Sequence, residues 1–145
     1  MGKRLLIADD EAGILELLKR YFEMAGYEVY TARDGGEVLE KAACRPDLIL
    51  LDINMPVMDG FEVLRTMNTN HTIEDVPVIM ISSDDSEEAI RKAYELGASD
   101  YVSRPFDAKI VYRRVVNTIK LVVLTSLFAT VFGQLIGYIN SRGRK

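Results

Sequence analysis

The chain has 145 residues, of which 48% are apolar and 28% charged, a balance that fits a folded protein and excludes a disordered one. All 22 acidic residues lie in residues 1–120 with 15 of the 18 basic ones, so this part carries a net charge of −7 and residues 121–145 carry +3. The length suits one domain with an appendage. The acidic part argues against direct binding to nucleic acid, which requires clustered Lys and Arg to release counterions.

The single cysteine and the single histidine carry little chemical information. Cys44 excludes an internal disulfide bond, and the chain starts without a signal-peptide pattern, so we expect a reducing, cytoplasmic location for the main body. His71 lies in a polar stretch, where a surface loop is a better interpretation than a ligand or a base. We therefore assign no role to His71.

Short apolar runs alternate with stretches of helical spacing over the first 120 residues, a pattern typical of a parallel sheet with helices on both faces. In chain order, the predicted elements are a strand at Lys3–Ala8, a helix from about Ile14 to Gly26, a strand at Tyr27–Thr31, a helix at Gly35–Ala43, a strand at Asp47–Leu51, a helix from Phe61, a strand at Val76–Ile81, a helix at Glu87–Leu96, a strand at Asp100–Ser103 and a helix from about Asp107. Right-handed crossovers make this a doubly wound open α/β sheet, in which ligands bind at the carboxyl ends of the strands.

Polar side chains follow the predicted strands where such a site is expected. Asp9 and Asp10 follow the first strand and Asp52 follows the third. Three carboxylates at one edge repel one another by roughly 1–4 kcal/mol per close pair unless a cation neutralises them. Hard oxygen ligands with room for water suit Mg²⁺ or Mn²⁺.

The same edge also receives groups that could hold a phosphoryl group. With a metal present, Asp52 could act as a nucleophile toward phosphorus, while the Ser82 hydroxyl and the Arg104 guanidinium hold the remaining oxygens. The alternative is that Asp10 and Asp52 merely cap helices. Convergence with Ser82 and Arg104 disfavours this alternative, because caps have no reason to gather at one edge.

Four motifs then carry a family resemblance. They are IADDE (7–11), LLDINMPVMDG (50–60), PVIMISS (77–83) and GASDYVSRPF (97–106). In this order and spacing, residues 3–119 resemble the receiver domain of two-component response regulators. The resemblance implies a flavodoxin-like sheet of strand order 2-1-3-4-5 with five helices, and an aspartate, matched by Asp52, that a sensor histidine kinase phosphorylates.

The resemblance also implies roles for individual residues around the site. Asp10, Asp52 and the backbone carbonyl of Asn54 would bind Mg²⁺, with Asp9 acting mainly through water. Ser82 and Tyr101 would form a switch pair. These roles describe a switch and not an enzyme, with phosphoryl transfer to the protein itself and slow self-dephosphorylation only.

In that family the switch is read on the face formed by the fourth helix, the fifth strand and the fifth helix. The bond from Arg104 to Pro105 is expected to be cis by the same resemblance.

Three residues depart from the family pattern. Arg104 stands where the family usually has lysine, and it is larger and planar, so the exchange is not neutral at a tight phosphate site. Ser82 replaces the commoner threonine, and Ser83 replaces a smaller residue. We expect Arg104 to affect the rate of phosphorylation or the strength of the switch.

The last 25 residues, 121–145, differ in composition from the receiver part, residues 1–120. No charged residue occurs from Leu121 to Ser141, a length that spans about 30 Å as an extension of the fifth helix. Basic residues flank this run, and Gly133 and Gly137 give it the GxxxG spacing of helix pairs. A membrane anchor through 121–141, a helix for homodimerisation and a truncated or frameshifted end remain open.

Two functions from other classes remain beside the phosphoacceptor switch. A metal-dependent aspartyl phosphatase or phosphotransferase would need a second acid/base aspartate two residues after its nucleophile, where Asn54 stands. A scaffold that is never phosphorylated would have Arg104 filling the pocket and would act through its C-terminal helix. No DNA-binding or catalytic output domain fits in 25 residues.

Overall fold

The computed structural model describes residues 2–70 and 75–143, so His71 lies outside the described residues. Five parallel strands form one sheet in the order β2-β1-β3-β4-β5, as expected. The strands are β1 (Arg4–Ala8), β2 (Glu28–Ala32), β3 (Leu48–Asp52), β4 (Val78–Ser82) and β5 (Asp100–Ser103). The helices are α1 (Ala12–Met24), α2 (Gly35–Ala42), α3 (Gly60–Thr69), α4 (Glu87–Glu95) and α5 (Ala108–Arg142).

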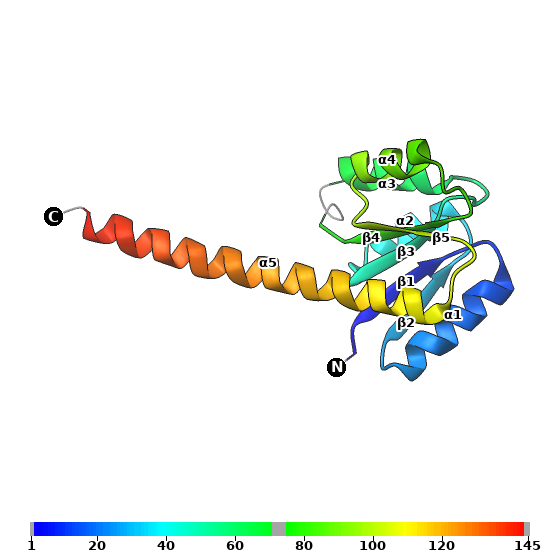
Figure 1. Ribbon diagram of the computed structural model, residues 1–145, viewed down its shortest axis with the longest axis horizontal. Coiled ribbons are helices and arrows are strands. Elements are labelled where there is room, and N and C mark those ends of the chain that lie inside the picture. Colours follow the sequence, from blue (N-terminus) through cyan, green and yellow to red (C-terminus); the bar gives the residue numbers. More distant parts are fainter. Residues whose placement is uncertain (1, 71–74, 144–145) are drawn as a thin grey trace.

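Helices cover both faces of the sheet (Figure 1). Alternate side chains of each strand point to opposite faces, so Leu5 and Ile7 pack with α1 and the first part of α5, while Leu6 and Ala8 pack on the side of α2, α3 and α4. All five residues of β3 are buried. This explains why the central strands read as unbroken apolar runs in the sequence.

The ends of the helices follow local chemistry. Side chains of Asp34, Asp59 and Ser86 accept hydrogen bonds from backbone N–H groups in the first turns of α2, α3 and α4. Gly26 and Gly97, which follow α1 and α4, have φ values of 97° and 101°, as left-handed helix caps do. The predicted elements are all confirmed, and their ends differ from the predicted ones by two residues at most.

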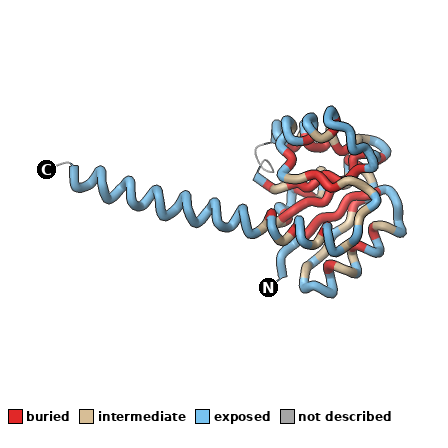
Figure 2. Tube along the Cα trace, in the orientation of Figure 1, coloured by how far each residue is buried: buried red, intermediate tan, exposed pale blue. Residues whose placement is uncertain are grey.

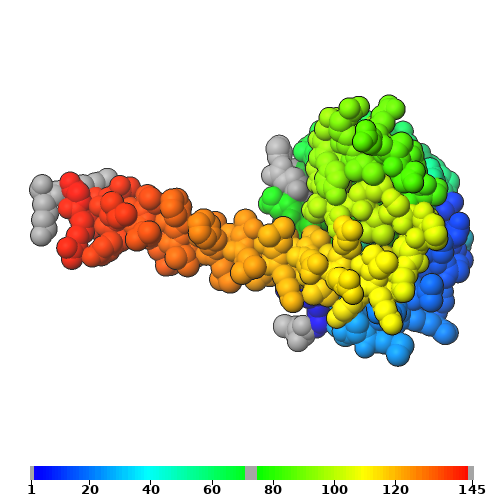
Figure 3. Space-filling view, viewed as in Figure 1, coloured from blue at the N-terminus to red at the C-terminus, as the bar shows by residue number. Residues whose placement is uncertain are grey.

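Only the first third of helix α5 packs against the rest of the domain. Val111, Val115 and Thr118 are buried against the sheet, whereas every residue from Lys120 to Gly143 is exposed (Figure 2). The helix continues without a break and projects from the domain as a rod (Figure 3). The predicted extension of the last helix is therefore confirmed.

Candidate functional site

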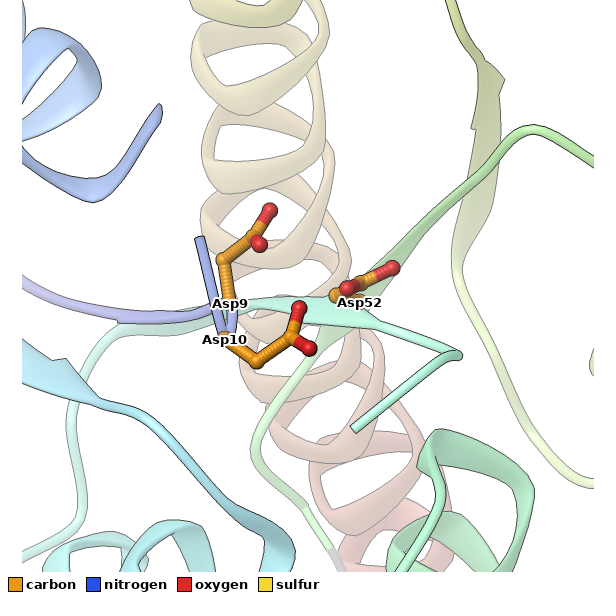
Figure 4. A group of neighbouring side chains, drawn as sticks. All are labelled: Asp9, Asp10 and Asp52. Carbon is orange, nitrogen blue, oxygen red and sulfur yellow. The ribbon is translucent and has the colours of Figure 1, made fainter. Parts of the chain in front are cut away.

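Three carboxylates meet at the carboxyl edge of the sheet. Asp9 and Asp10 follow β1, and Asp52 is the last residue of β3. Because β1 and β3 are paired in parallel, with Ala8 opposite Leu51, both strands deliver their next residues to the same place. One oxygen from each carboxylate lies within 4.8 Å of the others, and the three side chains are shown in Figure 4. Asp9 and Asp52 are buried and Asp10 is exposed.

Asp9 is held from two sides. Its Oδ1 accepts a hydrogen bond of 2.9 Å from the backbone N–H of Glu11, and its Oδ2 forms an ion pair with the guanidinium of Arg104. Glu11, not Asp10, is the N-cap residue of α1, and its side chain makes no capping hydrogen bond. Helix capping therefore does not explain Asp10.

The pKa of Asp52 is strongly perturbed. Burial raises the pKa of Asp52 from its ordinary 3.8 to about 6, and repulsion from Asp9 acts in the same direction. The guanidinium of Arg104, 3.6 Å from Asp52 Oδ1, and the N–H of Asn54, 3.4 Å from the same atom, lower the pKa in part. The site thus holds more negative charge than its own cation offsets, and it favours a further cation.

Ser82 and Tyr101 lie together beside this cluster. Ser82 ends β4, is fully buried, and its hydroxyl accepts a hydrogen bond of 3.0 Å from the N–H of Asp84. The Tyr101 hydroxyl donates to the carbonyl oxygen of Asp84 at 2.5 Å. Burial raises the pKa of the Tyr101 phenol, and a hydrogen bond with Ser82 opposes this shift. The two residues expected to form a switch pair therefore both bond to the backbone of Asp84.

Arg104 joins the end of β5 to the carboxylates. Its backbone N–H donates to the carbonyl of Ser82 at 2.7 Å, which fixes the start of its side chain beside β4. The Arg104–Pro105 bond is cis, as expected. The guanidinium contacts Asp9 more closely than Asp52. The sequence placed Arg104 at the site but did not distinguish between these partners.

Other residues at the site escaped the sequence analysis. The Arg33 guanidinium donates to the backbone carbonyl of Asp10 at 3.3 Å. Gly60 packs under the site, since a Cβ there would lie 2.6 Å from the carbonyl oxygen of Asp52 and 2.8 Å from Ile53 Cα. Val57, in the loop after β3, has a φ of 70°, which is strained for a β-branched residue. Of these three residues, Gly60 had a signal in the sequence, as the glycine that ends the motif LLDINMPVMDG (50–60).

The position of Asn54 agrees with a loop that folds back to the site. Its N–H faces Asp52, and it is exposed. The binding of a metal by its backbone carbonyl stays a prediction.

Comparison with known proteins gives one consistent family. The family model of the response regulator receiver domain matches residues 5–116. The chain is 40% identical over 116 residues to the alkaline phosphatase synthesis transcriptional regulatory protein PhoP of Bacillus subtilis (strain 168), covering 79% of this chain and 48% of that protein. It is 42% identical over 104 residues to the transcriptional regulatory protein PrrA of Mycobacterium leprae (strain TN), covering 71% of this chain and 44% of that protein.

The solved structures agree with the curated relatives. The chemotaxis response regulator CheY4 of Vibrio cholerae superposes with a TM-score of 0.77 at 31% identity, over 81% of this chain and 99% of that one. The chain spans a little under half the length of the curated relatives named above. The shared part is the receiver fold.

Proposed function

The chain belongs to the receiver-domain family of two-component response regulators, and we propose from this that Asp52 is its phosphoacceptor, phosphorylated by a sensor histidine kinase. The observation that carries the proposal is the cluster itself: a buried aspartate at the carboxyl edge, within 4.8 Å of two further carboxylates. Receiver domains act as phosphoacceptor switches and interact with sensor kinases. Response regulators are typically cytoplasmic, and we assign the receiver part of this chain to the cytoplasm.

The donor set fits a hard divalent cation. We assign Asp10, Asp52 and the carbonyl of Asn54 as ligands of Mg²⁺ or Mn²⁺, with Asp9 acting through water. When bound, the ion supplies positive charge that offsets the carboxylates and an incoming phosphoryl group. The raised pKa of Asp52, caused first by burial and then by repulsion from Asp9, supports this assignment, because a bound cation would favour the ionised carboxylate.

Each side chain then has a defined task in phosphoryl transfer. An Asp52 carboxylate oxygen forms a bond to phosphorus, and the bond from phosphorus to the donor atom breaks, so that the electron pair leaves with the donor. Arg104 and the Ser82 hydroxyl hold phosphoryl oxygens. To reach them, Arg104 exchanges part of its ion pair with Asp9, and the Ser82 hydroxyl turns from the Asp84 N–H.

Residues close to the site connect it to the face formed by α4, β5 and α5. The Ser82 hydroxyl and the Tyr101 hydroxyl both bond to the backbone of Asp84, so movement of the Ser82 hydroxyl changes the surroundings of the Tyr101 ring. One residue further back, Asp100 accepts hydrogen bonds from Arg114 of α5 at 2.8 and 3.0 Å and from Tyr94 of α4 at 3.3 Å. We therefore assign the α4, β5 and α5 face as the surface that phosphorylation alters.

Intact mass measurement tests the proposal. The protein is incubated with Mg²⁺ and a small acyl phosphate, and a single phosphoryl adduct is expected on the wild type but not on Asp52→Asn. Asp85→Asn, which removes an exposed carboxylate, is the matched control and should retain the adduct. Rapid consumption of the donor over many turnovers would instead indicate a phosphatase or phosphotransferase.

One observation supports a second candidate, a scaffold that is never phosphorylated. Arg104 already forms ion pairs with Asp9 and Asp52 and could keep the pocket closed to phosphate. The absence of any adduct from the wild type, together with an adduct on Arg104→Lys, would support this candidate.

A further inference from the structure

The uncharged segment, residues 121–141 of α5, begins with a turn that is apolar on every side. Leu121, Val122, Val123 and Leu124 are consecutive, so with 3.6 residues per turn they point to all sides of the helix, and each is between 41% and 65% exposed. Further along, the large apolar side chains share one side of the helix, at Leu127, Phe128, Val131, Phe132, Leu135, Ile136 and Ile139. The other side carries small or uncharged residues, at Ser126, Thr130, Gly133, Gln134 and Gly137. A helix that pairs in water has one apolar stripe and places charged residues on its outer face. This segment has no charged residue on either side, so it fits a surrounding apolar solvent.

The dimensions and ends of the segment fit a lipid bilayer. Its 21 residues make a helix of about 32 Å, close to the roughly 30 Å of a hydrocarbon core. Lys120 stands directly before it, and Arg142 follows it, with its guanidinium 5.4 Å from the centre of the Tyr138 ring. Basic and aromatic side chains at the two ends are typical of contacts with lipid headgroups.

The segment also satisfies part of its own polar groups. Thr125 donates its hydroxyl hydrogen to the carbonyl of Leu121 at 2.8 Å, and Thr130 donates to the carbonyl of Ser126 at 3.0 Å. The helix bonds its backbone internally. Both features lower the cost of placing the segment where no water is available.

We infer that residues 121–141 span a lipid bilayer and fasten the receiver to it with the phosphoacceptor site facing away from the membrane. The orientation follows from the topology. Helix α5 starts at the carboxyl edge of the sheet and runs back, so that Val116 lines a hollow with Lys3 and Gly26, which precede β1 and β2. The uncharged segment starts five residues beyond Val116. Helix α5 leaves the domain on the side of the N-terminus (Figure 1). The amino edge of the sheet therefore faces the lipid, and the three aspartates, which follow β1 and end β3, lie at the opposite edge.

Flotation of the full chain with vesicles of phosphatidylcholine and phosphatidylglycerol tests the insertion. The wild type should float with the vesicles and resist extraction by alkaline carbonate. Val131→Arg, which places a charge at the middle of the segment, should lower the ratio of inserted to free protein by roughly a hundredfold. Ser141→Arg introduces the same residue at the end and should float like the wild type. Both positions are exposed, so neither variant disturbs the receiver core.

Three outcomes would overturn the insertion. The wild type could stay in the supernatant, where sedimentation would show whether it is a monomer or a dimer held by the same segment. It could float but be extracted by carbonate, which would indicate surface adsorption only. Val131→Arg could float as well as Ser141→Arg. None of these readouts depends on phosphorylation, so this inference and the proposed function fail separately.

The native cysteine tests the orientation. Cys44 is exposed and lies between α2 and β3, at the amino edge, whereas Val57 is exposed in the loop after β3, at the carboxyl edge. A fluorophore on Cys44 should be quenched more strongly by a quencher attached to lipid headgroups than the same fluorophore on Val57→Cys in a Cys44→Ser background. Equal or reversed quenching would overturn the orientation.

Discussion

Replacing the buried Asp52 with asparagine should stabilise the metal-free receiver at neutral pH. Burial and repulsion from Asp9 raise the pKa of Asp52 from 3.8 to about 6, so the ionised carboxylate is less favourable in the folded protein than in the unfolded chain. At 1.36 kcal/mol per pH unit, a shift of this size corresponds to about 3 kcal/mol at most. Asparagine fills nearly the same volume without the charge, and we expect a gain of about 1–3 kcal/mol in the free energy of unfolding.

The sign of the pH dependence follows from the same shift. A carboxyl group whose pKa is raised on folding favours the folded state at low pH, and this contribution is lost as pH rises from about 4 through about 6. The wild type should therefore lose stability relative to Asp52→Asn across this window. Below pH 4 the two proteins should differ little, because Asp52 is then protonated in both states.

Urea unfolding followed by circular dichroism, with a metal chelator present, measures this difference. A chain that ends at Lys120 keeps every buried core residue and avoids the uncharged segment, and Asp85→Asn serves as the control for the loss of an exposed charge. Addition of Mg²⁺ should stabilise the wild type more than Asp52→Asn, by about 2.7 kcal/mol at a hundred times the dissociation constant. An Asp52→Asn variant that is no more stable at pH 7.5 would refute the reasoning, because Arg104 would then fully compensate the buried charge.

Four further substitutions, at three positions, test the surroundings of the site in the same unfolding assay. Arg104→Met leaves the buried Asp9 without its ion pair and should cost about 2–3 kcal/mol, whereas Arg104→Lys keeps the charge and should recover most of it; equal loss in both would show that shape and not charge matters. Val57→Asn relieves a φ of 70° in a β-branched residue and should gain about 1 kcal/mol, and a loss would contradict this strain. Gly60→Ala places a Cβ 2.6 Å from the carbonyl oxygen of Asp52 and should cost about 1–3 kcal/mol and slow phosphorylation from acyl phosphate; an unchanged rate would show that Asp52 is not displaced.

The elements of the sheet were predictable because parallel strands buried on both faces are apolar throughout. The exact ends of the strands were less predictable, because hydrogen bonds across the sheet set them. For example, the N–H of Asp47 donates to the carbonyl of Arg4, and β3 runs from Leu48 to Asp52. The sequence also placed the three aspartates correctly, since parallel strands deliver consecutive polar residues to one edge.

The contacts that tune the site were beyond the sequence. Arg33 lies in the loop after β2, and its guanidinium donates to the backbone carbonyl of Asp10. Every residue has a backbone carbonyl, so residue types do not indicate which carbonyl accepts a hydrogen bond. Val57 gave no signal of a left-handed conformation, because the residue types that normally mark one are Gly, Asn and Asp. The choice of Asp9 over Asp52 as the closer partner of Arg104 depends on side-chain geometry that spacing does not contain.

Helix α5 combines two environments in one continuous element. Up to Ile119 it alternates buried and exposed residues, with Val111 and Val115 in the core; from Lys120 it is exposed on all sides. This change of pattern was visible in the sequence and marks where the protein core stops covering the helix. The direction of the segment was not visible, because it depends on α5 running antiparallel to the strands. That direction places the aspartates at the edge away from the proposed membrane, where a kinase domain in the cytoplasm can approach them without displacing lipid.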